Sequence, residues 1–584
     1  MAPEHPGHAS SFNSILGLLA VPASDLTTTT ASQALIATGA AQSSQVHICV
    51  KVINIPWAAL FTFSVATLTL FLPAMKLTSL LSLAVLCGAA AAGVVTMNIE
   101  RNPASSGVSR RHPSKRDAIT ESLVNNITGG SYMASVSVGT PAQKLYLAID
   151  TGSSDVWLLS KTAGLCTSAA EQAYYGSCET TFNPAKSSTF KVVEKNGFDI
   201  TYADQSGASG DYVTDDFTVG GATVKNLEMG IAYNSTVTTG LLGIGYDTNE
   251  AANSIYPNIV DDMVSQGLIS AKAYSLYLDD LQSSTGSIIF GGLDSDKYHG
   301  SLVELPVAAE HLRNGSQIYA AFAVALTSLS VTSSSGSTVE LDNGGVAEAV
   351  ILDSGTTLTY LPDDLAASLF SEIGAYDDTF NSGNVYVDCN MRTKNSSMTI
   401  DYGFGGASSD ATVKVSISEL IFDLNGIFSL YPNTRLPSDL PFSQSDACAL
   451  GIQSGGGTNL LGDTFLRSAY VVYDLDNDKV AIAQTNFNST TSSIVQFTAG
   501  QTSIPNASGV ASSVSVTATA TGAQGAGAGG KASSTAQTSS TSSASGSASK
   551  SAAINSTPVL DLSGFVVLSI AGLLAVGGGS WFLA

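Results

Sequence analysis

A short motif that could bring two carboxylates into one site occurs twice in this chain. Asp-Thr-Gly-Ser-Ser at 150–154 follows the apolar residues Leu-Ala-Ile, and Asp-Ser-Gly-Thr-Thr at 353–357 follows Val-Ile-Leu. An apolar run leading into such a motif indicates a buried strand that ends in a tight turn. If two such turns faced each other, the like charges could not both ionise, so the carboxylates would share one proton. One carboxylate could then act as a base and the other as an acid, which suits hydrolysis of a peptide bond by water.

A single copy of the motif would be an ordinary Asp-Gly turn, which is common in proteins. Here each copy is followed by a second signal, Leu-Leu-Gly, at 241–243 in the first half and at 460–462 in the second half. Two distinct signals repeated in the same order indicate an internal duplication. The duplication predicts two related lobes with the site in the cleft between them, a common place for ligands to bind.

The region from about 117 to 488 is predicted to be β structure. Apolar and polar residues alternate along 133–138, and the pattern stops at Gly-Thr-Pro and resumes along 145–149. The stretches 470–473 and 479–483 flank a turn and predict a hairpin. Helical patterns are few, at 258–266 and 363–373. Many short strands separated by Gly/Ser turns predict an all-β fold with barrel-like lobes.

Composition excludes some partners. The chain has 584 residues, enough for two or three domains, and its 47 acidic and 24 basic residues give a formal charge of −23. This charge argues against nucleic acid as a partner and is compatible with work at low pH. Metal binding is not expected, because the region beyond residue 116 holds only His299 and His311 and no zinc spacing of Cys or His. No cofactor is expected, and the same scarcity of histidine argues against a Ser-His-Asp hydrolase.

Both ends of the chain carry targeting signals. Met75-Lys76 begins a segment, 75–92, with the charge, apolar core and small residues of a signal peptide. Residues 1–74 contain a further apolar stretch at 56–74, long enough to span a bilayer. We interpret residues 1–74 as an upstream extension that is not native, and an N-terminal membrane segment is the alternative. A propeptide is expected at 93–116, ending at the dibasic Lys115-Arg116, which a kexin-like protease would cut.

The C-terminal part is predicted to be a stalk and an anchor signal. Residues 491–557 are rich in Ser, Thr, Ala and Gly, so they cannot bury enough apolar surface to fold, and we expect a disordered stalk. Residues 558–584 end in an uncharged apolar tail with no basic residues after it, which is typical of a glycosylphosphatidylinositol anchor signal. Asn555 is the preferred attachment residue. We therefore expect a secreted protein at the cell surface, held to the membrane or wall by lipid.

The cysteines and sequons fit the secretory route. Cys49 and Cys87 lie in segments that we expect to be removed, and the remaining four cysteines allow three pairings. Proximity in sequence favours Cys166 with Cys178 and Cys389 with Cys448. Asn-x-Ser/Thr glycosylation sites occur at Asn126, Asn234, Asn314, Asn395, Asn488 and Asn506.

Residues 132–487 resemble the pepsin-like aspartic endopeptidases. Besides the two Asp motifs, the match includes Asp150–Trp157, Phe290–Asp294 with Tyr298 and Gly300, and Leu461–Arg467 followed by Tyr470–Asp474. With the stalk and anchor signal, the chain is most similar to fungal surface members of the yapsin and candidapepsin kind. The resemblance implies two β-barrel-like lobes, assigned to 117–310 and 311–490, a monomer, and protein or peptide substrates.

The resemblance also implies roles for individual residues. Asp150 and Asp353 would form the catalytic pair, with the choice of base left open. Thr151 and Ser354 would tie the two loops together, Gly152 and Gly355 would let backbone N–H groups approach, and Ser153 and Thr356 would bind the outer carboxylate oxygens. A β-hairpin flap would lie at 200–207, with Tyr202, Asp204 and Ser206 near the substrate and Trp157 supporting Tyr202. Family flaps have glycine where this chain has Ala203 and Gln205, which leaves substrate preference open.

The sequence is compatible with three classes of function. An active surface-anchored acid endopeptidase is favoured, because both motifs keep their Asp and Gly. A catalytically silent relative that binds peptides or inhibitors is the alternative, and an adhesive wall glycoprotein is the third possibility. Preference for basic or for apolar residues at the cleavage point is left open. The nearby acidic residues are interpreted as solvated surface: Asp211, Asp215, Asp216, Asp247 and Glu250.

Overall fold

The computed structural model describes residues 93–101, 131–283, 285–312, 316–342, 346–406, 411–424 and 436–511, together with 514 and 516. The chain divides into two compact units, Met1–Gly88 and Ala89–Ala584, and every described residue belongs to the second. Several predicted features therefore lie outside the described residues. These are the upstream extension, the signal peptide, Lys115, Arg116, Asn126, Asn314, Asn555 and the C-terminal tail.

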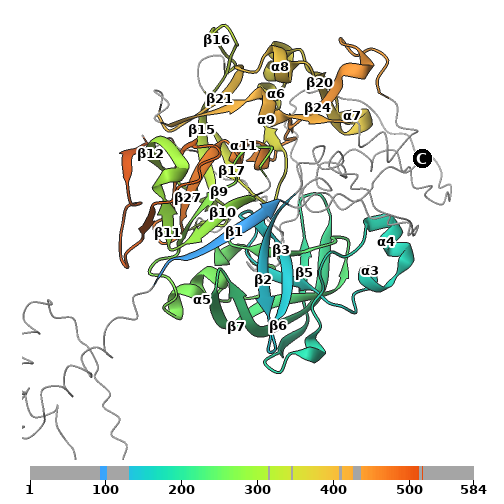
Figure 1. The fold of residues 1–584 in the computed structure, drawn as a ribbon, viewed down its shortest axis with the longest axis vertical. Helices are drawn as coiled ribbons and strands as arrows, with labels where there is room; N and C mark the ends of the chain where they lie inside the picture. Colours follow the sequence, from blue (N-terminus) through green and yellow to red (C-terminus); the bar gives the residue numbers. More distant parts are fainter. Residues whose placement is uncertain are drawn as a thin grey trace, which may run out of the picture. The chain divides into compact units, whose positions relative to one another are not determined.

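The described chain is mostly β structure (Figure 1). The strands are β1 (Val95–Arg101), β2 (Tyr132–Val138), β3 (Gln143–Asp150), β4 (Val156–Leu159), β5 (Lys191–Thr201), β6 (Gly207–Val219), β7 (Ala222–Ser235), β8 (Gly240–Gly243), β9 (Ala273–Tyr277), β10 (Thr285–Phe290), β11 (Gly292–Asp294), β12 (Tyr298–Pro306), β13 (Glu310–His311), β14 (Gln317–Ile318), β15 (Ala323–Thr332), β16 (Thr338–Glu340), β17 (Glu348–Leu352), β18 (Thr359–Leu361), β19 (Tyr376–Asp378), β20 (Asn384–Asp388), β21 (Thr399–Phe404), β22 (Ala411–Ser416), β23 (Ile421–Asp423), β24 (Ala447–Leu450), β25 (Ile452–Ser454), β26 (Leu460–Leu461), β27 (Ala469–Asp474), β28 (Lys479–Thr485), β29 (Ile494–Gln496) and β30 (Ala507–Val510).

Short helices connect these strands. They are α3 (Gly164–Thr167), α4 (Ala169–Tyr175), α5 (Ile259–Ser265), α6 (Asp363–Ile373), α7 (Thr379–Ser382), α8 (Met391–Lys394), α9 (Ile417–Leu420) and α11 (Asp463–Leu466), with 3-10 turns η1 (Pro184–Lys186), η2 (Asp247–Asn249), η3 (Ser295–Lys297) and η4 (Gln444–Asp446). The predicted helical patches at 258–266 and 363–373 correspond to α5 and α6. The predicted all-β fold with two related halves is confirmed.

Each half of the chain contains the same arrangement of four strands. In the first half, β3 runs parallel to β8, β8 antiparallel to β4, and β4 parallel to β7. In the second half, β17 runs parallel to β26, β26 antiparallel to β18, and β18 parallel to β25. The strand before each Asp motif therefore lies beside its own Leu-Leu-Gly strand, and the repeat in sequence is a repeat in space.

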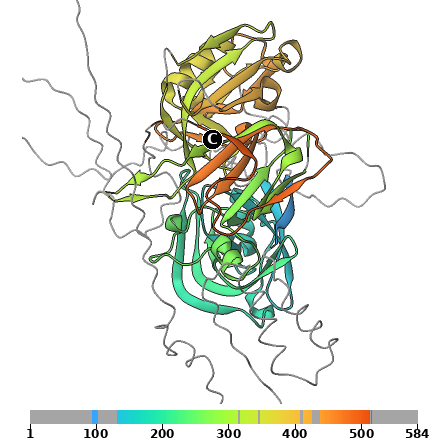
Figure 2. The same cartoon turned by 90° about the vertical axis from the view of Figure 1, so that its left-hand side faces the viewer.

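The two halves share one sheet, so a boundary at residue 310 does not separate their strands into two independent sheets. A 14-stranded sheet has the order β30-β12-β28-β27-β9-β10-β1-β2-β3-β8-β4-β7-β6-β5. Strands β27 and β28, from the end of the predicted C-terminal lobe, pair with β9 and β12 from the predicted N-terminal lobe. Figure 2 shows these orange-red strands between the cyan-green strands of the first half and the yellow-orange strands of the second. The C-terminal lobe has its own 8-stranded and 4-stranded sheets.

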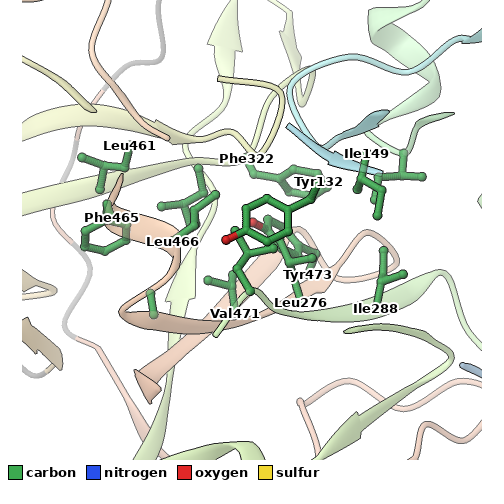
Figure 3. Close-up of a cluster of buried hydrophobic side chains, with 14 of the residues drawn as sticks. Tyr132, Ile149, Leu276, Ile288, Phe322, Leu461, Phe465, Leu466, Val471 and Tyr473 are labelled. Carbon is green, nitrogen blue, oxygen red and sulfur yellow. The ribbon is translucent and has the colours of Figure 1, made fainter. Parts of the chain in front are cut away.

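Buried side chains beneath the two Asp motifs form one continuous core (Figure 3). Ile149, the residue before the first Asp, and Leu461, which pairs with Leu352, belong to the same cluster. The rings of Phe322 and Tyr473 lie within it with centroids 4.6 Å apart. Because this core is well packed on both sides, the backbone of each motif is fixed by its neighbours.

The chain stays folded beyond the predicted start of the stalk at residue 491. Strand β29 pairs with β11, and β30 runs parallel to β12. Phe497 and Ile504 are 3% and 2% exposed. The N–H of Ile504 also donates to the Glu304 carboxylate at 2.5 Å. The burial of these two apolar side chains thus helps to hold residues up to Ala511 on the sheet. The average composition of this polar segment does not reveal that it folds.

Strand β1 lies within the predicted propeptide, 93–116, and yet forms an inner strand of the large sheet. It pairs with β10 on one side and with β2 on the other. Val95, Met97 and Ile99 alternate along it and are all buried. Among the described residues, no helix is long and apolar enough to cross a membrane.

Candidate active site

The two motif aspartates stand at equivalent places in the repeated arrangement. Asp150 ends β3 beside Gly243 of β8, and Asp353 directly follows β17, with its N–H donating to the Leu461 carbonyl at 3.1 Å. Asp150 is 5% exposed and Asp353 is half-buried. Each side chain therefore leaves a buried strand and enters the turn that the sequence predicts.

The two carboxylates face each other across the motif glycines. A Cβ added to Gly152 would lie 2.6 Å from Cγ of Asp353, and a Cβ added to Gly355 would lie 2.4 Å from Oδ1 of Asp150. Each glycine thus lies against the carboxylate of the opposite motif. A side chain at either position would collide with the pair, so glycine is required here by the close approach of the loops.

Each carboxylate accepts the same two hydrogen bonds from its own loop. The N–H groups of Gly152 and Gly355 donate to Oδ1 of Asp150 and Asp353, both at 2.8 Å. The Ser153 hydroxyl donates to Oδ2 of Asp150. The Thr356 hydroxyl donates to Oδ2 of Asp353 at 2.7 Å. These bonds fix the plane of each carboxylate and favour its charged form.

Thr151 and Ser354 join the two loops by reciprocal hydrogen bonds. The N–H of Ser354 donates to Thr151 Oγ1 at 2.9 Å, and the N–H of Thr151 donates to Ser354 Oγ at 3.2 Å. Each hydroxyl then donates to the carbonyl before the other Asp, Leu352 at 2.9 Å and Ile149 at 3.1 Å. All four bonds are buried, so both loops are held in fixed relative positions.

Electrostatics makes the pair unequal. Burial, followed by the charge of Asp353, raises the pKa of Asp150 from 3.8 to about 7, while the bonds from Ser153 and Gly152 act in the opposite direction. Two carboxylate charges this close in a partly dry site repel each other strongly, which disfavours the ionisation of both.

The predicted flap is the hairpin turn between β5 and β6. Trp157 donates from Nε1 to the Tyr202 hydroxyl at 2.8 Å. Burial, then the charge of Asp150, raises the pKa of Tyr202 well above its usual value. Ser206 donates to Oδ1 of Asp204 from both its N–H, at 2.9 Å, and its hydroxyl, at 2.7 Å.

The departure from glycine in the flap has a structural consequence at one of its two positions. Gln205 has a φ of 67°, in the left-handed region where glycine is favoured, and its N–H donates to the Tyr202 carbonyl at 2.9 Å. Ala203 has an ordinary negative φ and is exposed. A residue other than glycine is strained in this region, so the turn of the flap holds Gln205 in an unfavourable backbone conformation.

A buried acidic cluster lies behind the first motif and was not predicted from the sequence. Asp155, fully buried, accepts hydrogen bonds from the Tyr212 hydroxyl at 2.9 Å, the Tyr256 hydroxyl at 2.8 Å and the Ala251 N–H at 2.7 Å. Glu250, 4% exposed, accepts from the Tyr256 N–H at 2.9 Å, while its Oε1 is buried without a partner among the described residues. Its pKa is raised to about 10, mainly by burial and also by the charges of Asp155, Asp247 and Asp261.

The interpretation of the acidic residues as solvated surface is therefore wrong for Glu250. It is also wrong for Asp215, which is 1% exposed and accepts from the Thr189 hydroxyl at 2.5 Å. Both burials arise from tertiary packing, so no local pattern marks them. Asn249 also supports the site without having been predicted, donating from Nδ2 to the Gly152 carbonyl at 3.1 Å. Its position just after the first Leu-Leu-Gly signal was the available clue.

The state of Glu250 predicts a pH-dependent stability. The unfolded chain loses this proton near pH 4.5, whereas the folded protein keeps it to about pH 10, so stability falls as pH rises above 4.5. Glu250→Gln removes this titration and can still accept from Tyr256. Between pH 4.5 and 7 the wild type should lose about 3 kcal/mol more unfolding free energy than the variant.

Urea unfolding with pepstatin present, to limit self-digestion, checks this expectation. Glu348→Gln, at an exposed position of β17, is the matched control and should behave like the wild type. The same loss of stability in the wild type and in Glu250→Gln would contradict the assignment.

The remaining predicted residues are placed away from the pair. Disulfides join Cys166 to Cys178 and Cys389 to Cys448, the pairs favoured by proximity. The asparagines of three sequons, Asn234, Asn488 and Asn506, are exposed, and Asn395 is half-buried. Among the described residues, no group of His, Cys, Asp and Glu is arranged to hold a metal ion.

Two facing Asp-Thr/Ser-Gly loops, one from each half of a duplicated all-β fold, define the aspartic proteases. A family model described as eukaryotic aspartyl protease matches residues 131–485. The chain belongs to this family and is an aspartic-type endopeptidase.

Fungal relatives are similar over most of the chain. A protein named probable aspartic-type endopeptidase opsB, from Aspergillus oryzae, is 39% identical over 430 residues, which is 72% of this chain and 82% of the relative. A protein with the same name from Aspergillus fumigatus is 40% identical over 432 residues, with the same coverage of 72% and 82%. Secreted aspartic protease 6 of Candida albicans is 35% identical over 379 residues, 64% of this chain and 80% of that protein. A solved aspartic proteinase from Irpex lacteus aligns with 62% of this chain and 96% of its own, with 24% identity and a TM-score of 0.46.

Proposed function

We propose that Asp150 and Asp353 share one proton and activate a water molecule for hydrolysis of peptide bonds in acidic solution. The observation that carries this proposal is that each carboxylate lies against the glycine of the other's loop. The same loops hold both carboxylates in plane, so little reorganisation is needed when charge moves during the reaction.

The environments of the two carboxylates support a division of roles. Asp353, the less buried carboxylate, takes a proton from the water molecule. The water oxygen attacks the scissile carbonyl carbon at the same time. Asp150, whose pKa is raised to about 7, donates its proton to the carbonyl oxygen as the tetrahedral intermediate forms. Return of a proton to the leaving nitrogen then allows the C–N bond to break. The Tyr202 flap covers the site and limits the access of bulk water.

The pH dependence of cleavage tests this mechanism. The full-length secreted protein is incubated with a mixed peptide library between pH 3 and 7, with and without pepstatin. Cleavage should be strongest in acid and should fall as pH approaches 7, because the pair then loses its shared proton. Cleavage should vanish with pepstatin, and the cut sites decide between basic and apolar preference. A folded protein that cuts nothing at any pH would favour the catalytically silent peptide-binding alternative.

We further propose that the protein acts as a monomer on the outside of the cell. The two disulfides and the exposed sequons support passage through an oxidising secretory route. A signal peptide at 75–92, a propeptide cut by a kexin-like protease after Lys115-Arg116, and a lipid anchor at Asn555 complete this proposal. Release of the enzyme from intact cells by a phosphatidylinositol-specific phospholipase checks the anchor, and retention after treatment would contradict it.

A further inference from the structure

Asn249 ends the 3-10 turn η2, and its side chain reaches back to the first catalytic loop. Its Nδ2 donates to the Gly152 carbonyl at 3.1 Å. A carbonyl oxygen only accepts hydrogen bonds, so the NH₂ end of the amide must face it. The peptide unit that accepts this bond joins Gly152, which lies against the Asp353 carboxylate, to Ser153, whose hydroxyl donates to Asp150. Asn249 therefore holds a peptide unit whose two residues contact both carboxylates.

The turn that carries Asn249 is itself fixed on both sides. The Thr248 hydroxyl donates to the carbonyl of Tyr319, which lies between β14 and β15. The N–H of Ala251 donates to the buried carboxylate of Asp155 at 2.7 Å. Because its neighbours are bonded to two different parts of the fold, the Asn249 side chain is presented to the catalytic loop in a defined position.

Both motifs are also held from behind by backbone hydrogen bonds. The N–H of Gly245 donates to the Ser153 carbonyl at 2.9 Å, and the N–H of Asp463 donates to the Thr356 carbonyl at 2.9 Å. These donors lie just after the Leu-Leu-Gly signal of each half, so this arrangement is part of the duplication. The bond from Asn249 adds to it and acts on the motif glycine itself. Glycine has no side chain that could pack and restrict its backbone, so a bond from outside the loop has a large effect on its position.

We propose that Asn249 is a positioning residue of this protease, which holds the Gly152–Ser153 peptide so that the two carboxylates keep the separation needed to share a proton. This inference rests on the proposed function, because it assumes that the pair is the catalytic centre. Asn249 itself exchanges no proton with water or substrate. When its bond is lost, the Gly152–Ser153 peptide can rotate, and a small displacement of reacting groups lowers the rate of reaction strongly.

Two substitutions of Asn249 separate the loss of the donor from other effects. Asn249→Ala removes the donor at every pH. Asn249→Asp keeps the shape of the side chain and makes the donor depend on pH, because an un-ionised carboxyl group has one O–H donor and a carboxylate has none. An Asp side chain ordinarily loses its proton near pH 3.9, to about one unit, so the bond can form at pH 3 and is lost at pH 5.

Asn486→Asp is the matched control. Asn486 is half-buried like Asn249, and its Nδ2 donates to the carbonyl of Asp296 at 2.9 Å. The same change of amide to carboxyl group is thus made at a bond to a carbonyl outside the catalytic loops.

The measurement is kcat and KM at pH 3 and pH 5 for one peptide that the wild type cuts, both below the pKa of about 7 of Asp150. Asn249→Ala should lower kcat by about tenfold at both pH values and leave KM within about twofold, because the lost bond positions the pair and does not bind substrate. Asn249→Asp should stay within about threefold of the wild type at pH 3 and lose at least about tenfold at pH 5. Asn486→Asp should stay within about twofold at both, and thermal unfolding should show that all variants are folded.

Three results would overturn the inference while leaving the proposed function intact. The first is wild-type kcat in Asn249→Ala, and the second is a loss that appears in KM alone, which would mean that Asn249 binds substrate. The third is an Asn249→Asp enzyme whose activity relative to the wild type is the same at pH 3 and pH 5. A folded wild-type protein that cuts no peptide would instead overturn the proposed function, and the inference with it.

Discussion

Asp150→Asn and Asp353→Asn should each lower kcat/KM by about 10³-fold or more while the protein remains folded. Either change removes one member of the pair that exchanges protons with water and substrate. Asp150→Asn should also raise the melting temperature near pH 7, because the carboxyl group that is removed is held at a raised pKa of about 7 by burial and by Asp353. Loss of activity with a gain in stability is a combination that a merely misfolded variant cannot produce.

Peptide cleavage and thermal unfolding of the same preparations check this expectation. Asp377→Asn is a suitable control, because Asp377 is exposed and its Oδ1 accepts from Thr379, a role that asparagine can fill. It should leave both activity and stability near the wild-type values. Retention of more than about a tenth of the activity by either dyad variant would show that the reaction does not need a shared-proton pair.

Gly355→Ala should reduce activity by about 10²-fold or more, with a loss of stability of only about 1–3 kcal/mol. The added Cβ would lie 2.4 Å from Oδ1 of Asp150 and 3.1 Å from Oδ1 of Asp353, so the carboxylates must move apart. The backbone itself allows alanine, because Gly355 is not among the residues with a positive φ. The effect is therefore a direct report on the distance between the two carboxylates.

The matched control is Gly509→Ala in β30, where an added Cβ would meet its nearest neighbour, in Val303, at an ordinary 3.5 Å. This variant should keep wild-type activity. The pH dependence of the residual activity of Gly355→Ala should also change, since a more distant Asp353 raises the pKa of Asp150 less strongly. Normal activity in Gly355→Ala would mean that the loops lie farther apart in solution than in the structure.

The sequence could predict the part of the site whose contacts are made within short local motifs. Each Asp carboxylate accepts hydrogen bonds from the N–H two residues later and from the hydroxyl three residues later. Both donors belong to the motif itself, so the motif alone predicts these contacts. Duplication of the motif with its Leu-Leu-Gly partner was enough to predict two facing loops. Tyr202 could be proposed because the flap lies between the two motifs in a recognisable hairpin.

The rest depends on contacts between distant segments. In the sequence, Glu250 and Asp215 have the pattern of surface residues. In the structure, Tyr256 and Thr189, which are distant or separate in sequence, donate hydrogen bonds to them. Strands β27 and β28 read as an ordinary hairpin, and nothing local shows that they join a sheet with β9 and β12.

The position of β1 has a consequence for how the protein can be matured. A cut after Arg116 would separate β1 from the rest of the chain, although β10 and β2 pair with it along both of its edges. If the released peptide left, β10 and the first part of β2 would expose unpaired N–H and C=O groups, and open edges of this kind recruit other chains and cause aggregation. Removal of the peptide therefore has to be coupled to the insertion of another strand between β10 and β2. Otherwise the mature enzyme has to keep the peptide as a second, non-covalently bound chain.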